Sequence, residues 1–263
     1  MPWLSLFWNE FRRASLVRWS YRLDALSWLV IWGIAFPLIL LMFDSVSGGY
    51  GTDNRIASLV GFLVWDLCIG AMTATTQMIQ AEAQEGTLEV VLISPIPPVV
   101  IALLRVTAVF TRQLLETMLL GGFLLWVLGL TIPVNGATGL VLLVTMVGVV
   151  GVGLFLGGLA LVYKNIGNVV GVLGLLALFL TGAILPLNPL GFVFTLLKYS
   201  LPTTWGIETL RLTVLAGVNI ASLWQDGILF GLLLQAVVFL LGGIYAFRWG
   251  FYRAQQQGRL GSY

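Results

Sequence analysis

Long apolar runs dominate the pattern of hydrophobic and polar positions along this chain. A helix needs about 20 mainly apolar residues to cross the hydrocarbon core of a bilayer, and six segments approach or exceed that length. They are residues 25–43, 57–79, 103–130, 136–162, 167–185 and 226–249. The polar intervals between them are too short for a sizeable aqueous domain. The pattern therefore predicts an all-α membrane protein with six transmembrane helices in one domain, residues 25–263.

Residues 1–24 have a different pattern, in which apolar residues recur at helical spacing and charged residues fall elsewhere on the wheel. The apolar set is Leu4, Phe7, Trp8 and Phe11, and the charged set is Glu10, Arg12 and Arg13. This arrangement predicts an amphipathic helix that lies in the membrane interface. The alternative is a frayed cytoplasmic extension of the first span.

The fourth apolar segment contains Gly153 and Gly157 in small-xxx-small spacing. Small residues at this spacing let helix backbones approach closely in a bilayer, where lipid offers no hydrophobic drive for association. We therefore expect tight helix packing here, the alternatives being a hinge or a substrate path.

Prolines interrupt the region before the last span, at Pro186, Pro189 and Pro202. Irregular backbone at membrane depth persists only where it is buried in protein or lines a cavity. We interpret residues 186–218 as two short re-entrant helices that dip in from the outer face; an extracellular loop on the lipid surface is the alternative. Glu208 and Arg211 are i,i+3 neighbours and predict a local ion pair, which either stabilises these helices or borders an exit gate.

Composition supports the membrane assignment and the charges suggest its orientation. Apolar residues make up 59% of the 263 positions, charged residues 9%, and the mean hydropathy is +1.00. The basic residues on the side of both termini are Arg12, Arg13, Arg18, Arg22, Arg105, Arg112, Lys164, Arg248, Arg253 and Arg259, against Arg55, Lys198 and Arg211 on the other. The positive-inside bias predicts that both termini are cytoplasmic. A net charge of +2, without a basic stripe, argues against nucleic acid as a partner.

Away from the ends of the predicted spans, three charged residues remain: Asp66 in the second span, and Arg112 and Glu116 in the third. Buried ionisable groups are costly in a membrane and are normally paired. Because the two spans are consecutive and antiparallel, we expect Asp66 to meet Arg112 near mid-membrane. Such a pair acts either as a structural clamp or as a substrate or proton contact.

Some chemistry is missing from the sequence. There is no histidine, which excludes Ser-His-Asp and Cys-His nucleophiles and histidine-based metal sites. No G-x-x-x-x-G-K-[ST] loop is present for a nucleotide phosphate. We therefore expect neither an enzyme nor an ATP site of its own, and we assign the chain no resident cofactor or metal.

The segment 80–98 places acidic residues between two predicted spans. Glu82, Glu85 and Glu89 would share one face of a helix. Three readings stay open: a Mg²⁺ or Ca²⁺ site, a solvated acidic face, or a docking surface for a basic partner. Apolar residues flank that face at Leu88, Val91, Leu92 and Ile93, and Gly86 and Ser94-Pro95 break the helix. This frame favours a cytoplasmic docking helix.

The same residues carry a family resemblance. "EAQEGTLEVVLISPIP" resembles the coupling segment of ABC-2 transporter permeases, E-x-x-x-G-T-L-E-x-L-x-x-S-P. The matching positions are Glu82, Gly86, Thr87, Leu88, Glu89, Ser94 and Pro95. Val91 replaces the usual leucine, and Ala83 and Gln84 stand where the family often has arginines. A second match is "LPTTWGIETLR", similar to the family's Pro-x-x-x-x-x-x-E-x-x-R through Pro202, Glu208 and Arg211.

The resemblance implies two permease subunits, either identical or paralogous, that form a path through the cell membrane of a prokaryote. It also implies two ABC ATPase subunits that bind ATP and Mg²⁺ and receive the coupling helix, residues 80–98. By this resemblance the chain is an exporter subunit for a small amphipathic or lipid-like compound, with polysaccharide or glycolipid export as the alternative. A more distant alternative from the residues is an ATP-independent channel or secondary transporter.

Overall fold

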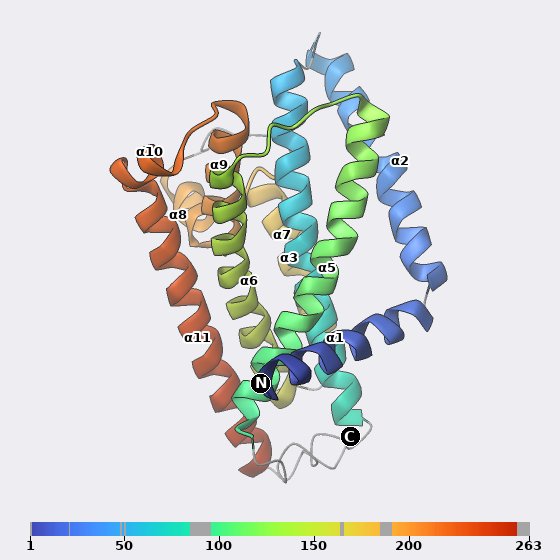
Figure 1. Ribbon diagram of the computed structural model, residues 1–263, viewed down its shortest axis with the longest axis vertical. Helices are drawn as coiled ribbons and strands as arrows, with labels where there is room; N and C mark the ends of the chain where they lie inside the picture. The colour runs from blue at the N-terminus through green and yellow to red at the C-terminus, as the bar shows by residue number, and fades with distance from the viewer. Residues whose placement is uncertain are drawn as a thin grey trace.

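The computed structural model describes residues 2–20, 22–47, 49, 51–84, 96–163, 166–184 and 191–256. These ranges contain helices and no strand, which confirms the predicted all-α class. The helices are α1 (Pro2–Ser20), α2 (Arg22–Ser47), α3 (Thr52–Gln84), α5 (Pro98–Leu128), α6 (Gly136–Val162), α7 (Gly167–Leu180), α8 (Phe192–Ser200), α9 (Pro202–Leu215), α10 (Ile220–Gln225) and α11 (Ile228–Gln256). In Figure 1 the long helices form a bundle, and α1 crosses it near the lower end, where α11 also ends.

Among the described residues, five helices are long and apolar enough to cross a membrane: α2, α3, α5, α6 and α11. The apolar window of α3 is mostly buried inside the protein, whereas that of α2 is mostly exposed. Figure 1 agrees, since α3 lies within the bundle and α2 stands at its edge. The chain is therefore a multi-pass membrane protein organised around α3.

The predicted fifth span, 167–185, is not confirmed as a crossing of full length. It forms α7, whose 14 residues cover about 21 Å, against about 30 Å of hydrocarbon. Gly182 adopts φ +63° and donates to the carbonyl of Phe179 at 3.2 Å, and the Ala183 amide donates to Leu178 at 3.3 Å. This is a Schellman ending, for which glycine is suited because it has no Cβ. The helix therefore stops within the apolar run.

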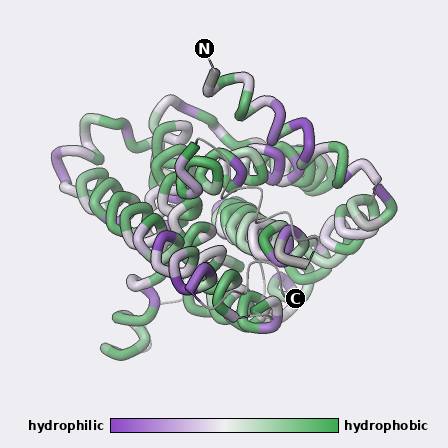
Figure 2. The backbone as a smooth tube through the Cα atoms, turned by 90° about the horizontal axis from the view of Figure 1, so that it is seen from below, coloured by the Kyte–Doolittle hydropathy of each residue, from purple (hydrophilic) through white to green (hydrophobic). Residues whose placement is uncertain are grey.

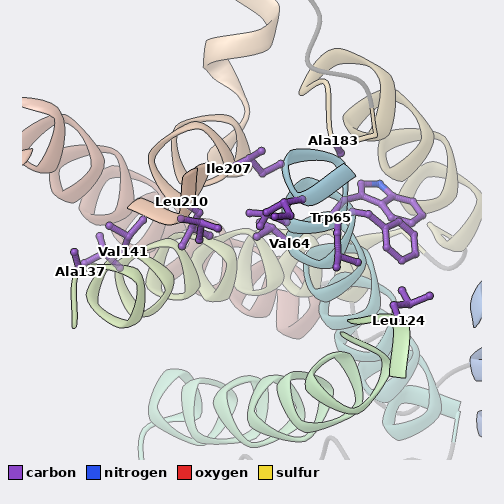
Figure 3. Packing of buried hydrophobic residues seen from close by; sticks show 14 of the residues in the cluster. Val64, Trp65, Leu124, Ala137, Val141, Ala183, Ile207 and Leu210 are labelled. Carbon is purple, nitrogen blue, oxygen red and sulfur yellow. The ribbon is translucent and has the colours of Figure 1, made fainter. Parts of the chain in front are cut away.

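Buried apolar side chains form two clusters along the bundle. The lower one joins α3, α5, α6 and α11, with Leu154 fully buried in it. The upper one joins the other halves of these helices to α2 and α9, and Figure 3 shows part of it around Trp65, Val141 and Ile207. The Trp65 indole also donates to the carbonyl of Gly174 at 2.8 Å, which ties α7 to α3.

The helices α6 and α11 share the most extensive contact in the bundle. A Cβ built on Gly243 would lie 2.7 Å from the carbonyl carbon of Gly151, and one on Gly250 would lie 2.7 Å from that of Gly158. The predicted close packing at Gly153 is confirmed on another face, where a built Cβ would lie 3.2 Å from Val106 of α5. α6 therefore packs closely against α11 through one set of glycines and against α3 and α5 through the other.

The described part of this region, residues 191–218, contains two short helices, α8 and α9, which matches the number predicted there; their depth in a membrane stays a prediction. Pro202 begins α9, at a position where its missing N–H is not needed. α9 packs against α6 and α3. Pro186 and Pro189 lie outside the described residues.

The first helix, α1, covers most of the segment that was predicted to lie in the membrane interface, and that placement stays a prediction. Trp3, Leu4, Trp8 and Trp19 are exposed, and α1 packs mainly against α5. Seen from below, hydrophilic positions gather along part of α1, while the bundle is largely hydrophobic (Figure 2). Of the predicted apolar face, Phe7 and Phe11 are half-buried, and of the predicted charged face, Arg12 is exposed. The predicted separation into an apolar and a charged face is therefore not confirmed, although Glu10 and Arg13 form ion pairs with the bundle.

Candidate functional site

Glu82 is the centre of an ion cluster that joins three helices at the lower end of the bundle. Its side chain, on the last turns of α3, is only 4% exposed. Arg13 of α1 donates to its Oε1 at 3.1 Å, and Arg105 of α5 donates to its Oε2 at 2.6 Å. Nε of Arg105 also donates to Glu10 of α1 at 3.2 Å. We call these four residues the Glu82 cluster; both carboxylate oxygens of Glu82 have cationic partners.

A second cluster lies further along α5. Arg112 pairs with Glu116 one helical turn away, and Nε of Arg18 on α1 donates to the same Glu116 oxygen at 3.2 Å. We call these residues the Glu116 cluster. The two clusters together hold α1 against α5 at two separate points.

The expected meeting of Asp66 with Arg112 is corrected by the structure. The Asp66 Oδ2 atom accepts a hydrogen bond from the hydroxyl of Thr117 on α5 at 2.7 Å. Arg112 instead pairs with Glu116, because that carboxylate lies on the same helix at i,i+4, within easy reach. Asp66 still links the second and third predicted spans, through a neutral partner.

A cavity of about 820 Å³ opens between α1, α3 and α5. Its wall includes three carboxylates and four arginines, from both clusters and Asp66: Glu10, Glu82, Asp66, Arg13, Arg18, Arg105 and Arg112. Uncharged side chains complete it, among them Val17, Trp28, Ile69, Met78 and Val109. The volume lies in the range of small-molecule sites in proteins, about 300–1,000 Å³.

The coupling residues can be placed only in part. Glu82 points into the bundle with its arginines, whereas we expected it on an exposed face with Glu85 and Glu89. The remaining motif residues, Glu85, Gly86, Thr87, Leu88, Glu89, Ser94 and Pro95, lie outside the described residues. The arginines around Glu82 come from α1 and α5 rather than from positions 83 and 84. Glu82 thus joins the start of the segment 80–98 to two other helices.

The upper end differs from the prediction in its ion pairing. Glu208 pairs with Lys198 of α8 at 2.6 Å rather than forming the expected i,i+3 pair with Arg211. Burial and, secondly, the Glu208 carboxylate raise the pKa of the nearby Tyr199 phenol. Lys198 reaches Glu208 because α8 and α9 fold against each other, an arrangement that linear spacing does not reveal.

Arg211 binds backbone carbonyls instead. It donates to Ala57 of α3 at 2.9 Å, to Gly182 at 2.8 Å and to Ala183 at 3.1 Å. The guanidinium therefore satisfies carbonyl groups at the end of α7 and fixes α9 to α3. Of the predicted gate residues, Glu208 and Arg211 are placed with these partners, Pro202 begins α9, and Pro186 is outside the described residues.

Arg211→Lys is expected to lower the free energy of unfolding by about 2 kcal/mol, since a lysine ammonium cannot reproduce the planar guanidinium geometry and hydrogen bonds to charged groups contribute roughly 1.5–3 kcal/mol. Thermal unfolding in detergent measures the effect. Arg55→Lys is the control, because Arg55 is over a third exposed where it pairs with Asp44. Equal destabilisation by the two variants would contradict the role given to Arg211.

Glu10, Arg13, Arg18 and Arg105 were not predicted as site residues. The arginines indicated only the orientation of the chain, although Glu10 and Arg13 already stood apart from the predicted apolar face of the first helix. That separation was the available signal, because charges on the inner side of an interfacial helix need partners in the bundle. It did not identify which carboxylates on α3 and α5 those partners are.

Apolar helices of spanning length, with ion pairs enclosed between them, define a polytopic helical membrane protein. A family model described as ABC-2 type transporter matches residues 3–215. The chain belongs to this family and is a transmembrane permease component of an ABC transporter. Permeases of the family generally work with ABC ATPase subunits. Comparison with curated proteins finds no match.

Proposed function

We propose that the chain is the transmembrane subunit of an ATP-driven exporter that moves a small amphipathic or lipid-like compound out of the cytoplasm or the inner leaflet. Two permease subunits form the path, and two separate ATPase subunits bind ATP and Mg²⁺. Family membership supports the permease role. The cavity beside α1, lined by both charged and apolar side chains, supports an amphipathic cargo of modest size.

The observation that carries the mechanism is the position of Glu82. It lies at the start of the segment 80–98 and bonds to both α1 and α5. When the ATPases close on ATP, they move the coupling segment, and the Glu82 cluster passes this displacement to α1 and α5 with α3. The permease then shifts between inward-facing and outward-facing arrangements, a two-state element biased by a ligand on another chain.

The proposal is tested by reconstituting the chain into liposomes with and without an ABC ATPase that co-purifies with it. ATP-dependent export of a fluorescent amphiphile, absent with a hydrolysis-deficient ATPase, is the expected result. Flux that never depends on ATP would identify a channel or secondary transporter instead. ATP-dependent movement of a lipid-linked glycan, with none of the amphiphile, would favour glycan export.

The coupling segment itself gives a prediction. Glu89→Lys, or replacement of Gly86 by leucine, should leave the subunit inserted but reduce ATPase binding, or transport per ATP hydrolysed, by about tenfold or more. The charge reversal opposes a basic docking partner, and leucine removes the helix break at Gly86. Co-purification and transport assays measure the effect.

The matched control is Asp53→Lys, the same charge reversal on the exposed first turn of α3, far from the segment 80–98. This variant should bind the ATPase and transport normally. Normal coupling in both the Glu89 and the Gly86 variants would show that the segment is only a solvated loop.

A further inference from the structure

The cavity between α1, α3 and α5 contains one carboxylate that is not part of an ion pair. The four arginines of the wall pair with Glu10, Glu82 and Glu116 in the two ion clusters. Asp66 is only 2% exposed and accepts from the neutral hydroxyl of Thr117, and the described residues place no lysine or arginine within ion-pair distance of it. A buried carboxylate without a cation is costly, and a positively charged ligand would offset that cost.

Asp66 lies about halfway along the apolar span of α3, Thr52–Glu82. The lining residues of α3 follow one helical face from Asp66 to Glu82, a rise of about 24 Å. The Glu82 cluster is at one end of this face and Asp66 is at the other. The cavity therefore extends from the coupling end of the permease to a carboxylate halfway along the span.

Gln113 of α5 adds a second polar group at the Asp66 end of the cavity. It is 6% exposed, it lines the cavity, and its amide has no hydrogen-bond partner among the described residues. The amide lies against Gly70, one turn from Asp66 on α3, where an added Cβ would overlap it. Buried polar groups in proteins are normally hydrogen-bonded, so this amide indicates a polar occupant of the cavity.

An aromatic side chain lies at the same level. Trp32 of α2 packs against Phe62 and Trp65 of α3, with ring centroids 5.1 and 5.6 Å apart. Trp28 precedes Trp32 by one turn on a helix that runs opposite to α3, which places it level with the turn that carries Asp66. Trp28 also lines the cavity. The face of an indole ring attracts a cation, more strongly where water is excluded.

We propose that the cavity binds a cationic amphiphile, whose protonated amine donates to Asp66 and to the side-chain carbonyl of Gln113, with Trp28 beside the positive charge. An ionised carboxylate only accepts hydrogen bonds, and an ammonium group supplies both the donors and the opposite charge. The two arginines that share one carboxylate in the Glu116 cluster lie beyond ion-pair distance of Asp66. The inference names the class of the cargo and rests on the proposed function.

Equilibrium binding to the full chain in phosphatidylcholine nanodiscs tests the proposal without ATP or an ATPase. Three fluorescent probes of similar size are compared at neutral pH: dansyl cadaverine, which carries a protonated amine, its neutral N-acetyl derivative, and the anion of dansyl aminohexanoic acid. Dansyl fluorescence, corrected for empty nanodiscs, measures binding. We expect the cation to bind about tenfold more tightly than either of the other probes, because only it makes a charge-assisted hydrogen bond to Asp66.

Variants of the two polar residues locate the site. Asp66→Asn removes the charge but keeps an oxygen that can accept from Thr117, and it should weaken binding of the cation about tenfold while binding of the neutral probe stays the same. Gln113→Met removes the amide at similar length and should weaken binding of the cation about fivefold. The matched control is Asp53→Asn on the exposed first turn of α3, which should bind the cation like the unaltered chain.

Equal affinity of the unaltered chain for the cation and the neutral probe, or tighter binding of the anion, would overturn the proposal. A loss in Asp66→Asn that is the same for cation and neutral probe would also overturn it, because Asp66 would then only stabilise the fold. If Asp66→Asn does not yield folded protein, Gln113→Met decides, and unchanged affinity for the cation in that variant would overturn the proposal.

These outcomes are separate from the test of the exporter. A chain that binds the cation through Asp66 but shows no ATP-dependent flux would keep this site and contradict the proposed function. ATP-dependent flux of an amphiphile without selective binding of the cation would do the reverse.

Discussion

Gly243→Ala should destabilise the protein by about 3 kcal/mol, at the upper end of the usual cost of overpacking. The added Cβ would lie 2.7 Å from the carbonyl carbon and 3.0 Å from the Cα of Gly151. These are backbone atoms, which cannot turn aside as a flexible side chain does. α6 and α11 would have to separate along their whole contact, including the second glycine pair, Gly158 with Gly250. The yield of monodisperse protein and the thermal unfolding midpoint measure the loss.

The adjacent position provides the control on the same helix. A Cβ built on Gly242 has no neighbour within 4 Å, and alanine is favoured over glycine inside a helix by roughly 1 kcal/mol. Gly242→Ala should therefore leave the midpoint unchanged or raise it. If the two alanine variants unfold at the same temperature, the close contact of α6 with α11 is not what stabilises this pair.

Glycine spacing could be read from the sequence, but not the neighbour that each glycine meets. Gly153 and Gly157 were predicted to pack closely, and they do so against α3, α5 and Phe247 of α11. Gly151 and Gly158 make the backbone contact with α11, on a different face of α6. The helical period fixes which residues share a face, whereas the order of helices around α6 depends on contacts between distant segments.

The long spans could be predicted from hydropathy because a crossing helix must be apolar over its whole length. The predicted fifth span shows where this reasoning fails, since its apolar run continues to residue 185 while α7 ends at Leu180. The glycine at position 182 was the local sign of a helix end, because glycine readily adopts the left-handed backbone that ends α7 there, with φ +63°. Hydropathy averages over such a residue, and glycine is also frequent inside transmembrane helices.

The candidate site could be predicted as a set of charges, but not as a set of pairs. Because buried charge needs compensation in a membrane, Asp66, Arg112 and Glu116 could be recognised from the sequence as residues that need partners. The partners depend on helix rotation and side-chain reach, and Asp66 bonds to Thr117 instead of Arg112. Glu82 was assigned to an exposed coupling face because the end of α3 and the arginines of α1 and α5 could not be placed from spacing alone.

Glu82→Gln is expected to destabilise the protein by about 3 kcal/mol, because removing one partner of a buried ion pair leaves the other charge poorly compensated. Arg105, with a side chain only 16% exposed, would lose its partner at 2.6 Å and keep only Glu10 at 3.2 Å. Arg13 would lose its partner too, but its side chain is 49% exposed and can be solvated. Thermal unfolding of the purified variant measures the effect. Arg13→Gln should cost much less, since Glu82 keeps Arg105.

A double-mutant cycle separates the ion pair from a general effect of polar substitution at this position. If loss of the 2.6 Å pair causes the destabilisation, the double variant Glu82→Gln/Arg105→Gln should be more stable than the sum of the two single losses implies. The double variant leaves neither the carboxylate nor the guanidinium of that pair buried without its partner. Additive losses would show that Glu82 and Arg105 stabilise the protein independently. They would also remove the physical basis for passing coupling-segment motion from Glu82 to α5.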